Sequence, residues 1–290
     1  MKVLGIVASY RKNGNTELMV KEAAKACIKS GSQVELVRLT DLVFKECTGC
    51  MSCIGKGVKC HINDDMEFLF EKVMDADGLI IGSPVYFLSP LGILKIVIDR
   101  FLMVGSKIAK NLIENKIKRA VTIGTAGLKN WNLQLPLLNI FPLSIGFRIM
   151  GSEMIFAPGP GEALLNPESV QKAYALGKAL VKGEKIPAPE GFCPVCYGNF
   201  FEFLDSEEVN CPVCNLKGKI LKDNGSSKII FPESPFKETR WHPLKMKEHM
   251  EGWVKASIIP FKENLPKIKE LRKPYKELDS LWINPKTSHD

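Results

Sequence analysis

The sequence has 290 residues, of which 45% are hydrophobic and 25% are charged, and this ordinary globular composition excludes a disordered chain. Its formal net charge is +8, and residues 216–290 hold 16 basic against 10 acidic side chains, so the excess lies mainly in the C-terminal part. A solvated basic surface is the preferred interpretation of this charge. Docking to an acidic redox partner or to nucleic acid is the alternative.

The chain shows no sign of membrane insertion or export. The most hydrophobic stretch, 91–104, is interrupted by Lys95, Asp99 and Arg100, whereas a spanning helix needs about 18 apolar residues. The first residues contain no cleavage site and are typical of a buried strand. We therefore expect a cytoplasmic protein with no membrane partner.

The nine cysteines indicate metal sites rather than disulfides. Eight of them fall into two tight groups, and clustered thiols in a reducing compartment are typical of metal binding. The ninth, Cys27, falls within a predicted helix, where we expect it to be a small buried hydrophobic residue.

Residues 1–185 alternate short β-branched runs with amphipathic stretches, which predicts a parallel sheet covered by helices on both faces. Five strands of this kind fit an α/β fold with a flavodoxin-like, doubly wound parallel sheet. The predicted strands are 3–8, 33–38, 78–82, 119–124 and 153–157, and the predicted helices are 16–30, 65–75, 90–104 and 167–182.

The composition changes after residue 185, where Pro187, Pro189 and Gly191 form a linker. The sequence predicts a small metal-binding module over 190–220 and a basic C-terminal extension over 221–290. One amphipathic helix is expected in the extension, near 243–256.

A polar loop follows the first predicted strand and opens a helix. It reads Ser-Tyr-Arg-Lys-Asn-Gly-Asn-Thr from Ser9 to Thr16, so hydroxyls, an amide and a glycine turn precede a helix N-terminus. Such a place can bind a phosphate, and the loop has neither the dinucleotide nor the Walker A spacing. Taken alone, the same residues could serve only as a helix cap.

Two further loops support a ligand-binding role for the polar loop. Gly82-Ser83-Pro84-Val85-Tyr86-Phe87 ends the third predicted strand, and Gly124-Thr125-Ala126-Gly127 ends the fourth. In open α/β sheets, ligands bind outside the carboxyl ends of the strands, so these loops predict one shared pocket. The string from Gly82 to Phe101, together with the polar loop, resembles the flavodoxin-like NAD(P)H-dependent FMN reductase and iron-sulfur flavoprotein families.

The resemblance implies a set of FMN-binding residues. Ser9, Arg11, Asn15 and Thr16 would hold the FMN phosphate. The isoalloxazine ring would be lined by Pro84, Val85, Tyr86 and Phe87 and by Gly124, Thr125, Ala126 and Gly127, with Tyr86 and Phe87 as its nearest neighbours.

The first cysteine group lies between the second strand and the second helix. Cys47, Cys50 and Cys53 are three residues apart and Cys60 follows, so four thiolates from the loop 47–60 can each bind one iron of a 4Fe-4S cluster. This loop resembles the compact cysteine motif of iron-sulfur flavoproteins. A cysteine-rich loop without a cluster, as in some flavin reductases of this superfamily, is the alternative.

The second group, Cys193, Cys196, Cys211 and Cys214, forms two Cys-Pro-Val-Cys knuckles. Two such knuckles joined by a hairpin are typical of a zinc ribbon with four thiolate ligands. A single iron, as in rubredoxin, would use the same ligands, but the spacer is short for that fold. We predict a structural zinc ion.

These observations predict a flavin-dependent oxidoreductase that contains FMN, a 4Fe-4S cluster and zinc, and in which no side chain serves as a general acid or base. By resemblance it would relay electrons between a ferredoxin-like carrier and an acceptor such as oxygen, peroxide, a quinone or a protein, and would form a homo-oligomer. One alternative is an NAD(P)H-dependent FMN or quinone reductase without a cluster. A second is a redox-sensing nucleic-acid or protein-binding module, but acidic residues in the ribbon hairpin oppose nucleic-acid binding.

Overall fold

The computed structural model describes residues 1–54, 60–101, 117–129, 133–223 and 226–281. Its chain divides into two compact units, Met1–Met246 and Lys247–Asp290. None of the helices in these described ranges is long and apolar enough to cross a membrane.

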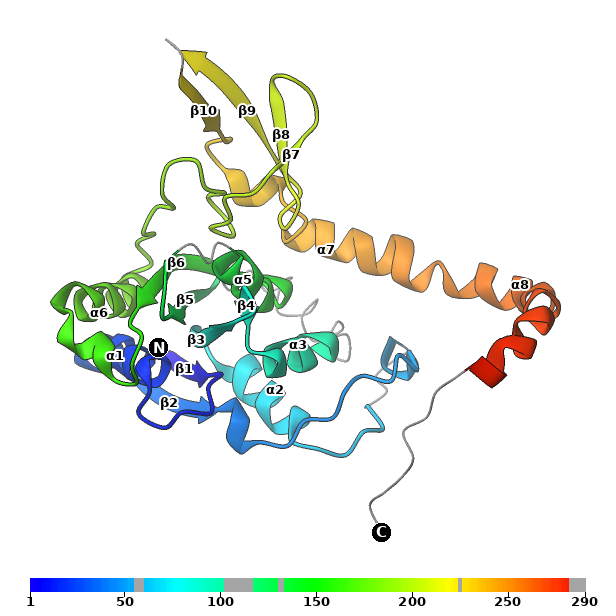
Figure 1. The fold of residues 1–290 in the computed structure, drawn as a ribbon, viewed down its shortest axis with the longest axis horizontal. Helices are drawn as coiled ribbons and strands as arrows, with labels where there is room; N and C mark the ends of the chain where they lie inside the picture. Colours follow the sequence, from blue (N-terminus) through cyan, green and yellow to red (C-terminus); the bar gives the residue numbers. More distant parts are fainter. Residues whose placement is uncertain (55–59, 102–116, 130–132, 224–225, 282–290) are drawn as a thin grey trace. The chain divides into compact units, whose positions relative to one another are not determined.

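The first unit is built on a five-stranded parallel sheet in the order β2-β1-β3-β5-β6, with the short β4 paired antiparallel to β3 (Figure 1). This order confirms the flavodoxin-like, doubly wound prediction. The strands are β1 (Lys2–Val7), β2 (Gln33–Arg38), β3 (Gly78–Tyr86), β4 (Ser89–Pro90), β5 (Lys118–Ala126) and β6 (Phe147–Phe156).

Helices cover both faces of this sheet (Figure 1). Helices α1 and α6 pack on one face, and α2, α3 and α5 pack on the other, because successive strand residues point to opposite sides. Leu4 and Ile6 face α2, for example, whereas Val3 and Val7 face α1. The helices are α1 (Asn15–Lys29), α2 (Met66–Asp75), α3 (Gly92–Asp99), α5 (Gln134–Ser144) and α6 (Pro167–Lys182).

Helix α5 is absent from the sequence prediction. Seven of its residues are buried, and it contains Pro142, so it shows almost no difference between an apolar and a polar face. Periodicity detects helices by that difference, and it therefore misses a helix that is buried nearly all round. Residues 102–104, predicted as the end of the third helix, lie outside the described ranges.

The second cysteine group lies in a four-stranded antiparallel sheet, β10-β9-β8-β7. This sheet runs to Ile230, past the predicted end of the module at 220, because β9 pairs with a further strand that the knuckle spacing did not indicate. The module also belongs to the same compact unit as the parallel sheet. Its strands are β7 (Glu202–Phe203), β8 (Glu208–Cys211), β9 (Leu216–Asp223) and β10 (Ser226–Ile230).

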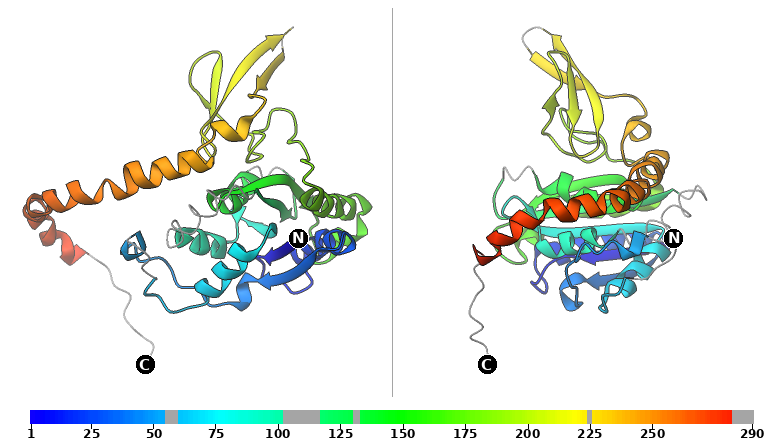
Figure 2. Two further views of the ribbon diagram at one scale, coloured as in Figure 1. Left: turned by 180° about the vertical axis from the view of Figure 1, so that it is seen from behind. Right: turned by 90° about the vertical axis from the view of Figure 1, so that its right-hand side faces the viewer.

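The C-terminal extension is more helical than the sequence predicts. Helix α7 (Pro243–His249) continues through a π-helical turn, Met250–Lys255, toward α8 (Ile258–Leu271), as the left view in Figure 2 shows. Pro260 and Pro266 argue against a helix in the sequence, but both are accommodated within α8.

Candidate FMN and metal sites

The polar loop after β1 leads into the N-terminus of α1. Gly14 is the N-cap residue and provides no side-chain hydrogen bond, so the first amides of α1 have no side-chain cap. Asn13 has a φ of 54°, which lets the chain turn sharply into the helix. An uncapped helix N-terminus is a suitable place for a phosphate because its amides and dipole favour an anion.

Other side chains hold this loop from outside. Arg38 and Thr40 both donate to the Ser9 carbonyl, at 3.1 and 3.0 Å. Glu17 accepts the Asn13 amide at 2.6 Å and pairs with Arg38 at 2.5 Å. The loop is thus held by side chains of β2, of the turn that follows it and of α1.

The side chains of two of the four predicted phosphate residues, Asn15 and Thr16, contact other loops of the sheet edge. The Asn15 side chain donates to the carbonyls of Ala157 and Gly159 and accepts the amide of Ala163, so it fastens the loop after β6. The Thr16 hydroxyl lies 2.6 Å from that of Thr125 on β5. Ser9 is buried and Arg11 is exposed.

The Thr16–Thr125 contact brings two of the predicted FMN loops together, and β3 brings the third. At Gly82, a Cβ atom would meet the Thr16 and Val20 side chains at 2.9 and 2.5 Å, so the end of β3 packs directly on α1. The loops after β1, β3 and β5 therefore lie at one edge of the sheet, as the sequence predicts. The roles of their residues as FMN ligands remain predictions.

The tip of the loop after β3 is a two-residue hairpin turn. Tyr86 pairs with Ser89, and both Phe87 and Leu88 between them have positive φ, at 45° and 70°. Large side chains rarely adopt this conformation, which is typical of Asn-Gly turns. Phe87 is 98% exposed, so the hairpin holds an aromatic ring in solvent beside the predicted flavin site.

Hydrogen bonds join the two ends of the cysteine loop, residues 43–45 and 64–65, and these residues form the base of the loop. The Val43 amide donates to Asp65 at 2.7 Å, and the Lys45 amide donates to Asp64 at 2.8 Å. Beyond this base, Cys47, Cys50, Cys53 and Cys60 line one small cavity together with Asp99 and Arg100. Residues 55–59 of the loop lie outside the described ranges.

Four thiols around one cavity suit a polynuclear iron site. Among the residues that the structure describes, these sulfurs do not form a group as tight as a single metal ion needs. In a cubane cluster each thiolate binds a different iron, so a wider arrangement is expected. The donor set therefore fits the predicted cluster.

Two residues of this site were not predicted. Arg100, at the end of α3, donates to the Cys60 sulfur at 3.5 Å and also contacts Asp64. Burial opposes ionisation of Asp64, but hydrogen bonds from Arg100 and from the Lys45 and Met66 amides outweigh it and lower its pKa below the usual 3.8. The sequence offers no specific signal for Arg100, because Lys95 and Asp99 of the same segment are also charged.

The second cysteine group has the close arrangement that a single metal ion needs. The ligand sulfurs of Cys193, Cys196, Cys211 and Cys214 all lie within 4.8 Å of one another and are buried. Tyr197 and Asn215, each directly after the second cysteine of its knuckle, have φ values of 60° and 53°, so the two knuckles turn alike. Such spacing matches a tetrahedral ion with metal–sulfur bonds of about 2.3 Å.

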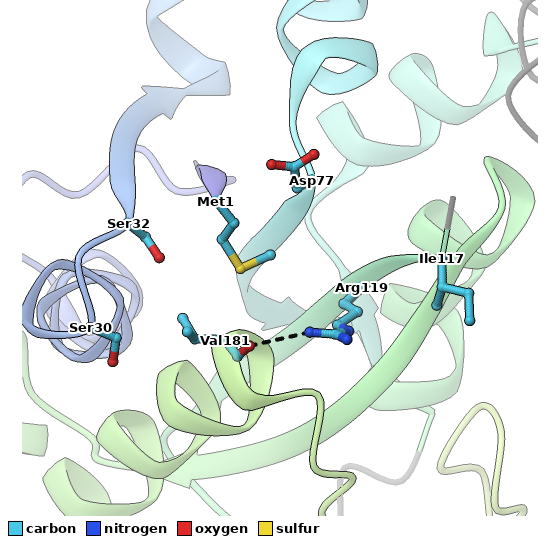
Figure 3. A pocket seen from close by; sticks show the side chains of 7 residues that line it. All are labelled: Met1, Ser30, Ser32, Asp77, Ile117, Arg119 and Val181. Atoms are coloured by element: carbon cyan, nitrogen blue, oxygen red, sulfur yellow. Dashed lines mark hydrogen bonds between the residues drawn. The ribbon is translucent and has the colours of Figure 1, made fainter. Parts of the chain in front are cut away.

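A larger cavity of about 370 Å³ lies elsewhere. Met1, Asp77 and Arg119 on its wall stand at the amino ends of β1, β3 and β5, the edge of the sheet opposite to the three loops (Figure 3). Arg119 there donates to the Val181 carbonyl at 3.2 Å. Its location separates this cavity from the predicted FMN site.

Comparison with known proteins agrees with this geometry. Residues 1–159, which include the three loops and the first cysteine group, match the family described as NADPH-dependent FMN reductase. An iron-sulfur flavoprotein of Methanocaldococcus jannaschii is 40% identical over 128 residues, which are 43% of this chain and 63% of that protein.

Two further proteins correspond to more of the chain. A flavone synthase of Aspergillus candidus, cfoJ, is 27% identical over 266 residues, covering 79% of this chain and 81% of that protein. The solved structure of a flavone reductase superposes with a TM-score of 0.70 at 21% identity and covers 99% of both chains. The superposition on the flavone reductase shows that the similarity in fold extends beyond the parallel sheet.

Proposed function

Since the chain belongs to the NADPH-dependent FMN reductase family and is a flavin-dependent oxidoreductase, we propose that it relays electrons between FMN and a 4Fe-4S cluster. The observation that carries this proposal is the presence of four thiols around one cavity in a chain with three flavin-type loops. FMN accepts an electron pair as hydride and releases electrons singly, whereas an iron-sulfur cluster passes one electron at a time.

The residues of this chain have separate tasks in the proposal. The backbone amides at the start of α1 bind the phosphate, with Ser9, Arg11 and Thr16 beside them. Asn15 acts indirectly, because its amide group is already bonded to the loop after β6. The loops at Pro84–Phe87 and Gly124–Gly127 orient the ring, and Cys47, Cys50, Cys53 and Cys60 hold the cluster.

The buried four-cysteine group serves as a structural site in this proposal. Four thiolates with no open position suit zinc, and no place remains for a substrate on the metal. A single iron would satisfy the same ligands, and metal analysis separates the two.

We further propose that a ferredoxin-like protein or NAD(P)H donates the electrons, in a homo-oligomer without a nucleic-acid partner. Anaerobic purification, metal analysis and chromatography of the released flavin test the cofactors. Four irons per chain and FMN are expected, and Cys53→Ala should lose the iron but retain the flavin. Recovery of FAD alone, or iron-free protein whose flavin is still bleached by NADPH, would contradict the relay.

A second candidate is reduction of a planar aromatic enone by hydride transfer from the flavin. The correspondence with a flavone reductase over nearly the whole chain favours it, as does the exposed apolar hairpin tip at Tyr86, Phe87 and Leu88. Turnover of a flavone with NADPH, measured before and after removal of the iron, distinguishes it from the relay. Full activity without iron would favour this second function.

A further inference from the structure

Arg100 places a buried positive charge against the cysteine loop. Its side chain is 1% exposed, and its Nη2 donates to the Cys60 sulfur at 3.5 Å. Its Nη1 contacts Asp64 and donates to the Lys45 carbonyl at 3.3 Å. One guanidinium therefore contacts a predicted cluster ligand and both sides of the base of the loop.

Burying the Arg100–Asp64 ion pair does not by itself stabilise the fold, which suggests that the charge of Arg100 has a functional role. A buried ion pair gains little over apolar packing because both ions lose their hydration. Asp64 is also 1% exposed, and within the described ranges the buried Arg100 Nε has no hydrogen-bond partner. The neighbouring residues of α3, Leu94 and Val97, are apolar and buried, so an apolar side chain would suit the end of this helix as well.

The hydrogen bond from Arg100 to the Cys60 sulfur lets this charge act on the predicted cluster. Reduction of an iron-sulfur cluster adds one negative charge, which its ligand sulfurs share, and hydrogen bonds to sulfur and nearby charge set the reduction potential. A cation beside Cys60 stabilises the reduced cluster more than the oxidised one. The nearby carboxylate of Asp64 has the opposite effect and offsets part of the cation.

We propose that Arg100 is a positioning residue that raises the reduction potential of the cluster through its hydrogen bond to Cys60, and that Asp64 limits this effect. The inference rests on the proposed cluster. It makes the Arg100–Asp64 pair a device that adjusts the driving force between cluster and flavin.

Redox titration of the full-length protein, followed by electron paramagnetic resonance of the reduced cluster, tests the proposal. Arg100→Gln should shift the midpoint to lower potential. Asp64→Asn, which removes the negative charge and keeps one oxygen for the Lys45 amide, should shift it to higher potential. Lys95→Gln is the matched control, because Lys95 lies on the same helix but is 71% exposed and screened by solvent.

Opposite shifts, each several times larger than that of Lys95→Gln, are expected, because a merely structural role would not produce opposite signs. Shifts in the same direction, or no larger than the control, would overturn the proposal. If Arg100→Gln failed to assemble a cluster, Asp64→Asn would decide, and a midpoint that did not rise in that variant would overturn the proposal. Iron-free wild-type protein would overturn the proposed relay itself and this inference with it.

Discussion

Asn139 on α5 donates a 2.9 Å hydrogen bond to the carbonyl of Cys196, one of the four cysteines of the predicted single-metal site. The same amide group accepts the Thr122 hydroxyl at 2.6 Å and donates to Ser152 at 3.1 Å, so it connects the cysteine knuckle with β5 and β6. All three side chains are buried. The four-cysteine module is therefore hydrogen-bonded, through Asn139, to β5 and to the edge strand β6 of the parallel sheet.

Replacing Asn139 with Ala should destabilise the first unit by about 1–3 kcal/mol, because buried polar groups lose their partners. The cysteines are unchanged, so the metal content should stay the same. Differential scanning calorimetry with metal analysis measures both quantities. As a comparison, Cys211→Ser should lose the metal and should also lower the melting temperature of the parallel sheet. An unchanged melting temperature would show that the four-cysteine module and the parallel sheet unfold independently.

The packing of β3 on α1 predicts opposite outcomes for two glycines near the flavin loops. Gly82→Ala should weaken FMN binding by at least tenfold, because the new methyl group would collide with Thr16 and Val20 and displace the start of α1. Gly92→Ala is the control, since a Cβ atom at Gly92 would meet nothing within 4 Å. Fluorescence titration with FMN gives both affinities, and equal affinities would contradict this view of the site.

Glu17 predicts a pH-dependent contribution to stability. Burial raises its pKa, but hydrogen bonds from Arg38, Lys21 and the Asn13 amide outweigh this and lower the pKa from 4.5 to about 2. Because the folded protein favours the ionised form, the contribution is complete above about pH 5 and is lost as the pH falls toward 2.

Glu17→Gln should therefore reduce the free energy of unfolding at pH 7 by on the order of 3 kcal/mol, since each pKa unit corresponds to about 1.4 kcal/mol. The difference from wild type should shrink between about pH 5 and pH 2. Urea unfolding at a series of pH values measures it. A difference that stays constant over this range would show that the carboxylate charge is not the cause.

The hairpin tip predicts a conflict between stability and activity. Phe87→Asn should stabilise the protein by up to about 1 kcal/mol, because asparagine tolerates the positive φ and the exposed ring makes no packing contact to lose. If the ring contacts an aromatic acceptor, the same variant should raise KM for a flavone. Thermal unfolding and steady-state kinetics test the two effects, and a destabilised variant would refute the strain argument.

The sequence by itself determined the local elements that carry their own signals. Helix α6 was predicted with its observed bounds because Asn166 caps it, Pro167 opens it and Gly183 ends it in the left-handed conformation. The polar loop, the two glycine-containing loops and the spacing of both cysteine groups are likewise local patterns. They were sufficient for the fold class and the family.

The tertiary structure decided which of these patterns meet. Periodicity shows that a residue is buried, but not against which partner, so the contacts of Arg100 with Cys60, Thr16 with Thr125 and Asn139 with Cys196 could not be predicted. Each pair joins residues far apart in the chain, and only the order of the strands brings them together. For the same reason, the bonds between the metal module and the parallel sheet, across a linker of prolines, arise only when the chain is folded.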